Sequence, residues 1–392
     1  MANLLLPVIY LAFISLGLPD SLLGSAWPIM HTDLNCPVSY AGIVSMIISF
    51  CTIISSLNSD RLTKKLGAGL VTAISVGMTC VALFGFSFSH YFWMLCLIAI
   101  PYGLGAGSVD AALNNYVALH YKSRHMSWLH CMWGIGASTG PYLMGLAISR
   151  QNSWNMGYRY VGFIQIVLTA ILILSLPLWK NRKDEDNALS GEGGANKTEK
   201  ALSLKDVLKV KGAKPVMICF FCYCALEQTT GLWAASYLNL YRGIDAETAA
   251  FFASLFYIGI TAGRAINGFV TMKLSDKKLI TIGQAIILTG VILMFIPGLK
   301  TLSLAGFIII GLGCAPIYPC IIHSTPETFG KDKSQAMVGV QMASAYVGST
   351  FMPPLFGLIA KYITISLLPV YQLIILALMF IMYRMVRNQA EA

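Results

Sequence analysis

NRKDEDNALSGEGGANKTEKALSLKDVLKVKG, residues 181–212, is the one long polar interruption in an otherwise apolar chain. The segment is charged and has no aromatic residue, so we expect its first part to be disordered. Its second part, around residues 202–210, has the pattern of a short amphipathic surface helix. Long apolar runs stand on both sides, and residues 181–213 are therefore predicted to link two membrane-embedded halves.

Six runs on each side of this linker are long enough to cross a bilayer, which takes about 20 apolar residues. The N-terminus reads as the first span and not as a cleaved signal peptide. We predict an all-α membrane protein with twelve transmembrane helices in two pseudo-symmetric halves, residues 1–180 and 214–392. The spans are expected at 4–29, 38–58, 66–88, 91–121, 126–149, 156–180, 214–241, 246–272, 278–297, 300–323, 334–360 and 364–386.

Composition excludes a soluble protein. The 392 residues are 56% hydrophobic and only 11% charged, whereas a soluble domain carries about 25% charged residues. The ten cysteines lie almost wholly inside apolar runs and show no zinc-site spacing. We interpret them as small packing residues.

The basic residues orient the chain. Of the 27 Lys and Arg residues, 21 fall on the side that carries the linker and both termini. The positive-inside rule therefore places both termini in the cytoplasm. We expect a multi-pass protein of the plasma membrane, here a bacterial inner membrane. The same distribution explains the net charge of +10 without a nucleic-acid partner.

Three acids interrupt the spans: Asp20, Asp110 and Glu227. A charge inside a bilayer costs roughly 3 kcal/mol, so such residues are functional candidates. We expect no basic partner at their depth, because Arg264 and His130 should lie nearer the cytoplasm. The acids are then suited to carry H+ or Na+. The alternative is that each acid only forms a hydrogen bond with a neighbouring helix.

The six-plus-six layout resembles the major facilitator superfamily, whose site lies near the membrane midplane between two halves. SLNSDRLTKKLG, residues 56–67, resembles the family's basic gating loop, and residues 268–279 are a weaker second copy. Ser56, Asn58 and Thr63 depart from the family pattern. The resemblance implies a gating set of Asp60, Arg61, Lys64 and Lys65, to which we add Arg264 from the eighth span.

GLPD at residues 17–20 and GAGSVDAALNNYV at residues 105–117 resemble the fucose permease type of sugar:proton symporter. Segments 128–141, 225–238, 311–319 and 340–357 are similar to its sodium-dependent glucose transporter-like relatives. This resemblance implies that Asp20 and Asp110 serve substrate binding and ion coupling. The permease has glutamate where Asp110 stands, so H+ and Na+ both remain open.

A sugar site needs flat apolar faces for the ring and polar groups for the hydroxyls. Tyr257 could add a further face, and Asn115 and Asn267 further hydrogen bonds. The predicted substrate-binding set is Asp20, Asp110, Asn114, His130, Trp133, Glu227, Gln228, Trp233, Tyr237, Tyr318 and Gln341. No catalytic or metal-binding constellation stands out, so we expect neither an enzyme nor a cofactor.

One motif supports a different function. GASTGPYLMG, residues 136–145, resembles a glycine-proline motif of drug:proton antiporters, with Met144 in place of one glycine. Small residues at this spacing also allow close helix packing. We therefore predict a monomeric secondary transporter working by alternating access, a cation-coupled symporter of a sugar or related polar molecule. The alternative is an H+-coupled exporter of drugs or metabolites.

Overall fold

Helices make up the regular structure of the chain. The computed structural model describes residues 2–20, 22–37, 40–151, 153–179, 202–244, 246–296 and 300–390. Within those ranges all regular elements are helical and none is a strand. A helix satisfies its own backbone hydrogen bonds, as a bilayer requires. The all-helical prediction is confirmed, while residues 181–201 of the predicted linker lie outside the described ranges.

The long helices of the described residues follow the predicted spans. Ten segments are long and apolar enough to span a membrane, and the first, Leu4–Trp27, joins α1 and α2. Two further long helices coincide with predicted spans: α7, which is rich in glycine and polar residues, and α12, which is apolar over Leu255–Val270. The helices are α1 (Ala2–Asp20), α2 (Leu22–Asp33), α3 (Tyr40–Leu57), α5 (Ala68–Ser87), α6 (Phe92–His120), α7 (Ser123–Gln151), α8 (Trp154–Leu174), α11 (Ala213–Leu240), α12 (Ala246–Val270), α13 (Asp276–Phe295), α14 (Lys300–His323), α16 (Lys331–Tyr362) and α17 (Leu368–Ala390).

The chain forms two compact units. Unit 1 comprises residues 1–116 and 132–202, and unit 2 comprises residues 117–131 and 203–392. The end of α6 and the beginning of α7 therefore group with unit 2. The predicted domain boundaries at 180 and 214 remain a prediction, and the structural units differ from them at this α6–α7 connection.

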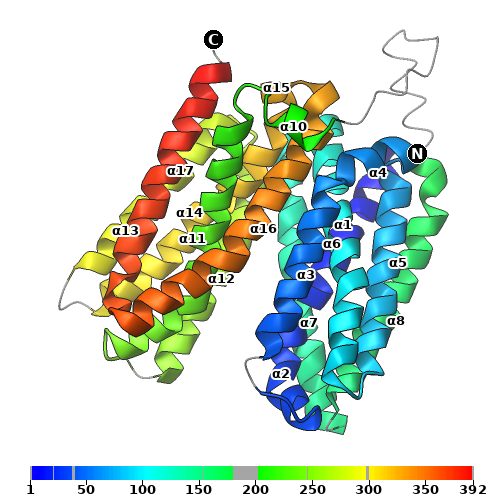
Figure 1. Ribbon diagram of the computed structural model, residues 1–392. Coiled ribbons are helices and arrows are strands. Elements are labelled where there is room, and N and C mark those ends of the chain that lie inside the picture. The colour runs from blue at the N-terminus through cyan, green and yellow to red at the C-terminus, as the bar shows by residue number, and fades with distance from the viewer. Residues whose placement is uncertain are drawn as a thin grey trace. The chain divides into compact units, whose positions relative to one another are not determined.

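Unit 1 is built around an aromatic core. Helix α5 packs along α8, and α1 also contacts α8 (Figure 1). The Phe86 ring lies 5.5 Å from that of Tyr158 and 6.0 Å from that of Tyr102, and Trp154 meets Tyr158 at 6.1 Å. Offset and edge contacts of this kind are favourable for aromatic rings, and they fix the α5–α8 side of the unit.

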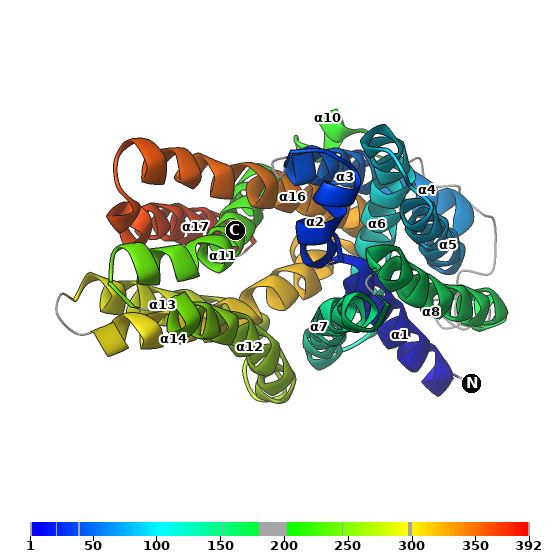
Figure 2. The same ribbon diagram turned by 90° about the horizontal axis from the view of Figure 1, so that it is seen from below.

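Unit 2 packs its helices in three close pairs. Helix α13 lies along α14, α12 also contacts α14, and α11 runs along α16, an arrangement seen from below in Figure 2. Tyr237 of α11 is fully buried, and its hydroxyl donates to the carbonyl of Met294 across 3.2 Å. Its ring contacts Phe307 of α14, so this residue joins three helices.

Four short elements lie between the long helices: α4 (Ser59–Leu66), α10 (Leu204–Val207), α15 (Thr325–Phe329) and the 3-10 turn η1 (Ile365–Leu367). The surface helix predicted around 202–210 is present as α10, and Val207 buries its apolar side. The Ser203 hydroxyl accepts from the backbone N–H of Asp206 as an N-cap. A hydrogen bond from the same hydroxyl lowers the pKa of the Asp206 carboxyl.

Candidate functional site

A carboxylate and an indole meet in unit 1. Asp20 ends α1, and Trp133 Nε1 of α7 donates a hydrogen bond to its Oδ2 across 2.8 Å. The Tyr102 hydroxyl and the Asp110 carboxylate both lie near enough to Asp20 to interact with it electrostatically. Residues of α1, α6 and α7 therefore converge. Of these four, Tyr102 was not predicted from the sequence.

Asp110 is held by a residue one turn further along α6. Asn114 Nδ2 donates to Oδ1 of Asp110 across 2.8 Å and to the Asp110 carbonyl across 2.9 Å. Asn114 is completely buried, whereas Asp110 is partly exposed. We therefore interpret Asn114 as a positioning residue for the carboxylate and not as a direct substrate ligand.

Small residues bring α7 against α1 so that Trp133 can reach Asp20. A Cβ added at Gly136 would lie 2.2 Å from the Ile14 carbonyl oxygen, and one at Gly140 would lie 2.1 Å from that of Leu18. Gly145, in contrast, has nothing within 4 Å of such a Cβ. Two glycines of the antiporter-like motif thus serve helix packing. Packing was the alternative to an antiporter function as the explanation of this motif.

Glu227 does have a basic partner, which corrects the expectation from the sequence. Arg264 of α12 lies 3.6 Å from Oε1 of Glu227 on α11, and both residues are less than 10% exposed. From the sequence, Arg264 was expected nearer the cytoplasm than Glu227. Helix tilt and the long arginine side chain allow the two residues to meet. Arg264 belongs to this buried pair in unit 2, and its predicted part in gating stays a prediction.

An aromatic group surrounds that ion pair. The guanidinium of Arg264 lies 6.0 Å from the centre of the Tyr318 ring, and the His130 ring meets Tyr318 edge-on at 4.5 Å. Tyr223, one turn before Glu227, interacts with both members of the pair. The sequence analysis missed Tyr223, although its i,i+4 spacing from Glu227 was a usable signal.

Several predicted substrate ligands are engaged elsewhere in unit 2. Trp233 donates from Nε1 to the Pro353 carbonyl across 3.0 Å and packs on Phe356. Gln341 is fully buried and accepts from the Thr325 hydroxyl across 3.1 Å. Because the rings of Trp233 and Tyr237 pack against protein, we do not keep either as a sugar face. Gln228 is half-buried on α11.

The predicted gating loop is a helix, α4, in the described structure. Asp60 is buried, and its carboxylate lies 3.3 Å from the Lys64 ammonium and accepts from the Leu202 backbone N–H across 3.0 Å. Arg61 and Lys65 are exposed on the same helix. Asp60 therefore ties Leu202, within the predicted linker, to α4 in unit 1.

A polar network fastens the α6–α7 connection within unit 2. His323 Nδ1 lies 2.6 Å from Oδ2 of Asp276, and its Nε2 lies 3.0 Å from the Tyr121 carbonyl oxygen. Ser123 donates to the other Asp276 oxygen, and Asn267 donates to Ser127 across 2.7 Å. The sequence analysis did not use His323, because position near a span end alone gave no reason to choose it.

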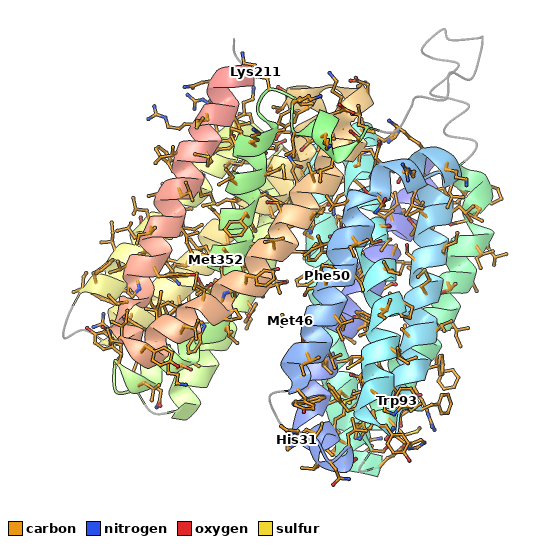
Figure 3. All side chains as sticks on the ribbon, viewed as in Figure 1. His31, Met46, Phe50, Trp93, Lys211 and Met352 are labelled. Carbon is orange, nitrogen blue, oxygen red and sulfur yellow. The ribbon has the colours of Figure 1, made fainter. Side chains whose placement is uncertain are left out.

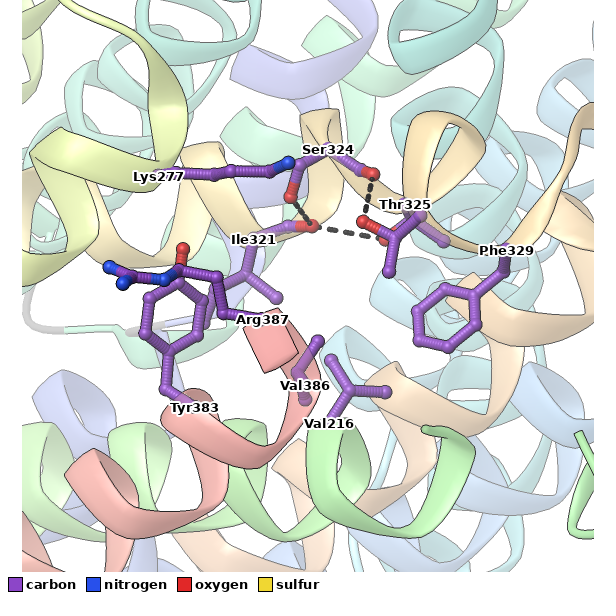
Figure 4. A pocket seen from close by; sticks show the side chains of 10 residues that line it. Val216, Lys277, Ile321, Ser324, Thr325, Phe329, Tyr383, Val386 and Arg387 are labelled. Atoms are coloured by element: carbon purple, nitrogen blue, oxygen red, sulfur yellow. Dashed lines mark hydrogen bonds between the residues drawn. The ribbon is translucent and has the colours of Figure 1, made fainter. Parts of the chain in front are cut away.

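A small cavity is lined by α11, α13, α14, α15 and α17 (Figure 4). Its volume is about 20 Å³, which is room for about one water molecule. The hydroxyl oxygens of Ser324 and Thr325 on its wall both lie 3.0 Å from the Ile321 carbonyl oxygen. This space is too small for a sugar. The described residues contain no group of three or more His, Cys, Asp or Glu that could hold a metal.

Comparison with known proteins places this geometry in a family. The profile described as Major Facilitator Superfamily matches residues 9–252 and 216–392. Bypass of stop codon protein 6 of Saccharomyces cerevisiae is 23% identical over 93% of this chain and 79% of that protein. The glucose/mannose transporter GlcP of Bacillus subtilis is 23% identical over 89% and 86% of the two chains.

A drug-resistance protein and a solved symporter structure complete the comparison. The quinolone resistance protein NorA of Staphylococcus aureus is 24% identical over 80% of this chain and 78% of its own length. A crystal structure of the E. coli fucose:proton symporter FucP matches with a TM-score of 0.78 at 15% identity, covering 98% and 99% of the two chains. At that identity the match concerns the fold.

Proposed function

Because this chain belongs to the major facilitator superfamily, and is thus a multi-pass membrane transporter and not an enzyme, we propose that it couples sugar uptake to H+ or Na+. The contact between Trp133 and Asp20, beside Asp110, carries the proposal. It combines an aromatic face with two acids at one place inside the membrane-spanning helices.

Two neighbouring carboxylates favour the uptake of a cation. Like charges repel strongly where the dielectric constant is low, and each charge also loses hydration there. Binding H+ or Na+ at Asp20 and Asp110 relieves both costs. The partner that Trp133 offers Asp20 is a neutral indole, which orients the carboxylate without cancelling its charge.

The same group suits a sugar. Asp20 is exposed and can accept hydrogen bonds from sugar hydroxyls, while the indole of Trp133 offers a flat face for the C–H side of the ring. Binding of a cation to Asp20 and Asp110 then changes the charge of the groups that face the sugar. Cation binding and sugar binding are thereby coupled. The name of GlcP, a glucose/mannose transporter, supports a hexose as the first substrate to test.

Glu227 has a different role in this proposal. Its charge is balanced by Arg264 in unit 2, so we assign ion coupling to Asp20 and Asp110 alone. His130 and Tyr318 surround the pair. We propose that both termini lie in the cytoplasm and that a monomer is the working form.

Reconstituted transport tests this function. Purified protein in liposomes should accumulate labelled glucose or a related hexose when an inward H+ or Na+ gradient is imposed. Asp110→Asn should abolish accumulation but keep sugar exchange at equal concentrations, because exchange needs binding without coupling. Asp332→Asn, at an exposed acid of α16, is the matched control. Gradient-driven accumulation by Asp110→Asn would contradict the coupling role.

NorA gives the second candidate, an H+-coupled exporter. Inverted vesicles loaded with a fluorescent cationic drug distinguish the two functions. Drug movement driven by the proton gradient, without any sugar exchange, would favour export. The packing role of Gly136 and Gly140 removes one motif that supported it.

A further inference from the structure

Unit 1 contains a polar cavity of its own, separate from Asp20 and Asp110 of the proposed transport site. Its volume is about 330 Å³, within the range of roughly 300–1,000 Å³ that is usual for small-molecule sites. The walls come from the end of α2, the α5–α6 connection and the α7–α8 connection with the beginning of α8. All three segments are ends of spans, at the end of unit 1 opposite α4 (Figure 1).

Arg159 supplies the positive charge of this cavity. One terminal nitrogen of its guanidinium lies 3.6 Å from the Met156 sulfur, a weak acceptor, and the group lies 4.9 Å from the centre of the Phe88 ring. The buried Nε of Arg159 has no hydrogen-bond partner among the described residues. Among the same residues, no carboxylate lies within 4.0 Å of the guanidinium. A planar guanidinium with donors to spare is suited to a phosphate.

Asp33 supplies a negative charge on the same wall. Its Oδ2 accepts from Trp154 Nε1 across 2.7 Å, and the residue is exposed. The two opposite charges line one cavity without pairing with each other. A ligand that carries both charges satisfies both residues, whereas a simple anion is repelled by Asp33.

The place of the cavity indicates where such a ligand comes from. Trp93 and Tyr91, close by on the α5–α6 side, are 59% and 63% exposed, and Figure 3 shows Trp93 toward the same end of unit 1 as His31. Exposed aromatic rings at span ends mark the level of the lipid headgroups. Polar pockets between helices at this level bind headgroups through their charges.

We propose that this cavity binds the zwitterionic headgroup of a membrane phospholipid, with the phosphate at Arg159 and the amine at Asp33. The shared chemistry is a phosphate ester with an amine, which a lipid or a soluble ester could carry. The position between span ends assigns it to the lipid.

Lipid titration of the purified full-length protein, followed by native mass spectrometry, tests the proposal. Phosphatidylethanolamine should bind about tenfold more tightly than phosphatidylglycerol, and Arg159→Gln should lose about tenfold in phosphatidylethanolamine binding. Arg150→Gln changes a neighbouring arginine that does not line the cavity, and it should bind like the unmodified protein. Asp33→Asn should raise phosphatidylglycerol binding to the level of phosphatidylethanolamine.

Three results would overturn the proposal: equal binding by Arg159→Gln and Arg150→Gln, unchanged lipid preference in Asp33→Asn, or equally tight binding of soluble glycerophosphoethanolamine. The last result would identify a soluble ligand instead of a lipid. Arg159→Lys keeps the charge and guards against misfolding of Arg159→Gln. It should bind phosphatidylethanolamine more weakly than the unmodified protein but more tightly than Arg159→Gln, because it keeps the charge without the planar fork. Binding by folded Arg159→Lys no tighter than by Arg159→Gln would overturn the charge-based site.

Discussion

The indole Nε1 of Trp133 donates a hydrogen bond to the carboxylate of Asp20 across 2.8 Å, joining α7 to α1 in unit 1. The contact depends on the glycines that let the two helices approach. An aromatic face and an ionisable acid are thereby fixed to each other, and loss of one changes how the other meets a substrate.

Trp133→Phe should raise the half-saturation concentration for sugar exchange. The variant keeps an aromatic face but removes a hydrogen bond to a carboxylate, which contributes about 1.5–3 kcal/mol, or roughly 10- to 100-fold in affinity. Exchange assays in liposomes measure this. Trp93→Phe, at an exposed ring, is the control. If both variants had the same half-saturation concentration, Trp133 would not contact the sugar site.

Breaking the Glu227–Arg264 pair on one side should destabilise the protein strongly. Glu227→Gln leaves the arginine buried without its charge partner, a loss of about 3–5 kcal/mol, and Arg264→Gln does the same to the acid. The double variant should recover part of this loss. Thermal unfolding in detergent, analysed as a double-mutant cycle, gives the coupling.

The exposed pair Asp332–Lys333 provides the comparison for that cycle, since its groups lie 3.9 Å apart and are 57% and 43% exposed. Such a pair contributes about 0–1 kcal/mol. Additive effects of Glu227→Gln and Arg264→Gln, as for the exposed pair, would show that the buried contact does not matter for stability.

Alanine at two glycines of α7 should lower stability, while alanine at a third should not. At Gly136 and Gly140 the new Cβ would meet backbone oxygens of α1 at 2.2 and 2.1 Å, so the helices must separate. Overpacking of this kind costs about 1–3 kcal/mol. Gly145→Ala has open space and serves as the control. Equal unfolding temperatures for the three variants would refute the close contact.

The sequence predicted much of the fold, because length and hydropathy alone determine whether a segment can cross a membrane. It also predicted that Asp110 and Asn114 share a helix face, because that contact lies within one helix. Contacts between helices were harder. Depth along a span does not specify helix tilt or the reach of a side chain. The sequence therefore predicted Arg264 and Glu227 to lie apart, although they form a pair.

The same limit applies to the aromatic residues. Tyr237 and Trp233 share a helix and a residue class with plausible sugar ligands, yet their polar atoms bond to the Met294 and Pro353 carbonyls. Only the rotation of α11 against its neighbours decides this, and a single sequence does not contain that rotation. Tyr102 was missed for the same reason, since its hydroxyl lies near an acid on another helix.

The α6–α7 connection should be held by a protonated His323. Its two ring nitrogens face two acceptors, the Asp276 carboxylate and the Tyr121 carbonyl. Both contacts are hydrogen bonds only when both nitrogens carry a proton. Glu327, Lys277 and Cys320 also lie around this group, as do Tyr383 and Arg387 of α17.

Raising the pH should therefore loosen residues 117–131, because the neutral ring keeps one donor and loses the other contact. A hydrogen bond contributes about 0.5–1.5 kcal/mol, so the opening equilibrium should rise by up to roughly tenfold. Hydrogen–deuterium exchange of that peptide at pH 6 and pH 8.5, corrected for intrinsic exchange, measures the change. His323→Gln should show no such step. The same pH step in His323→Gln would mean that another group controls the connection.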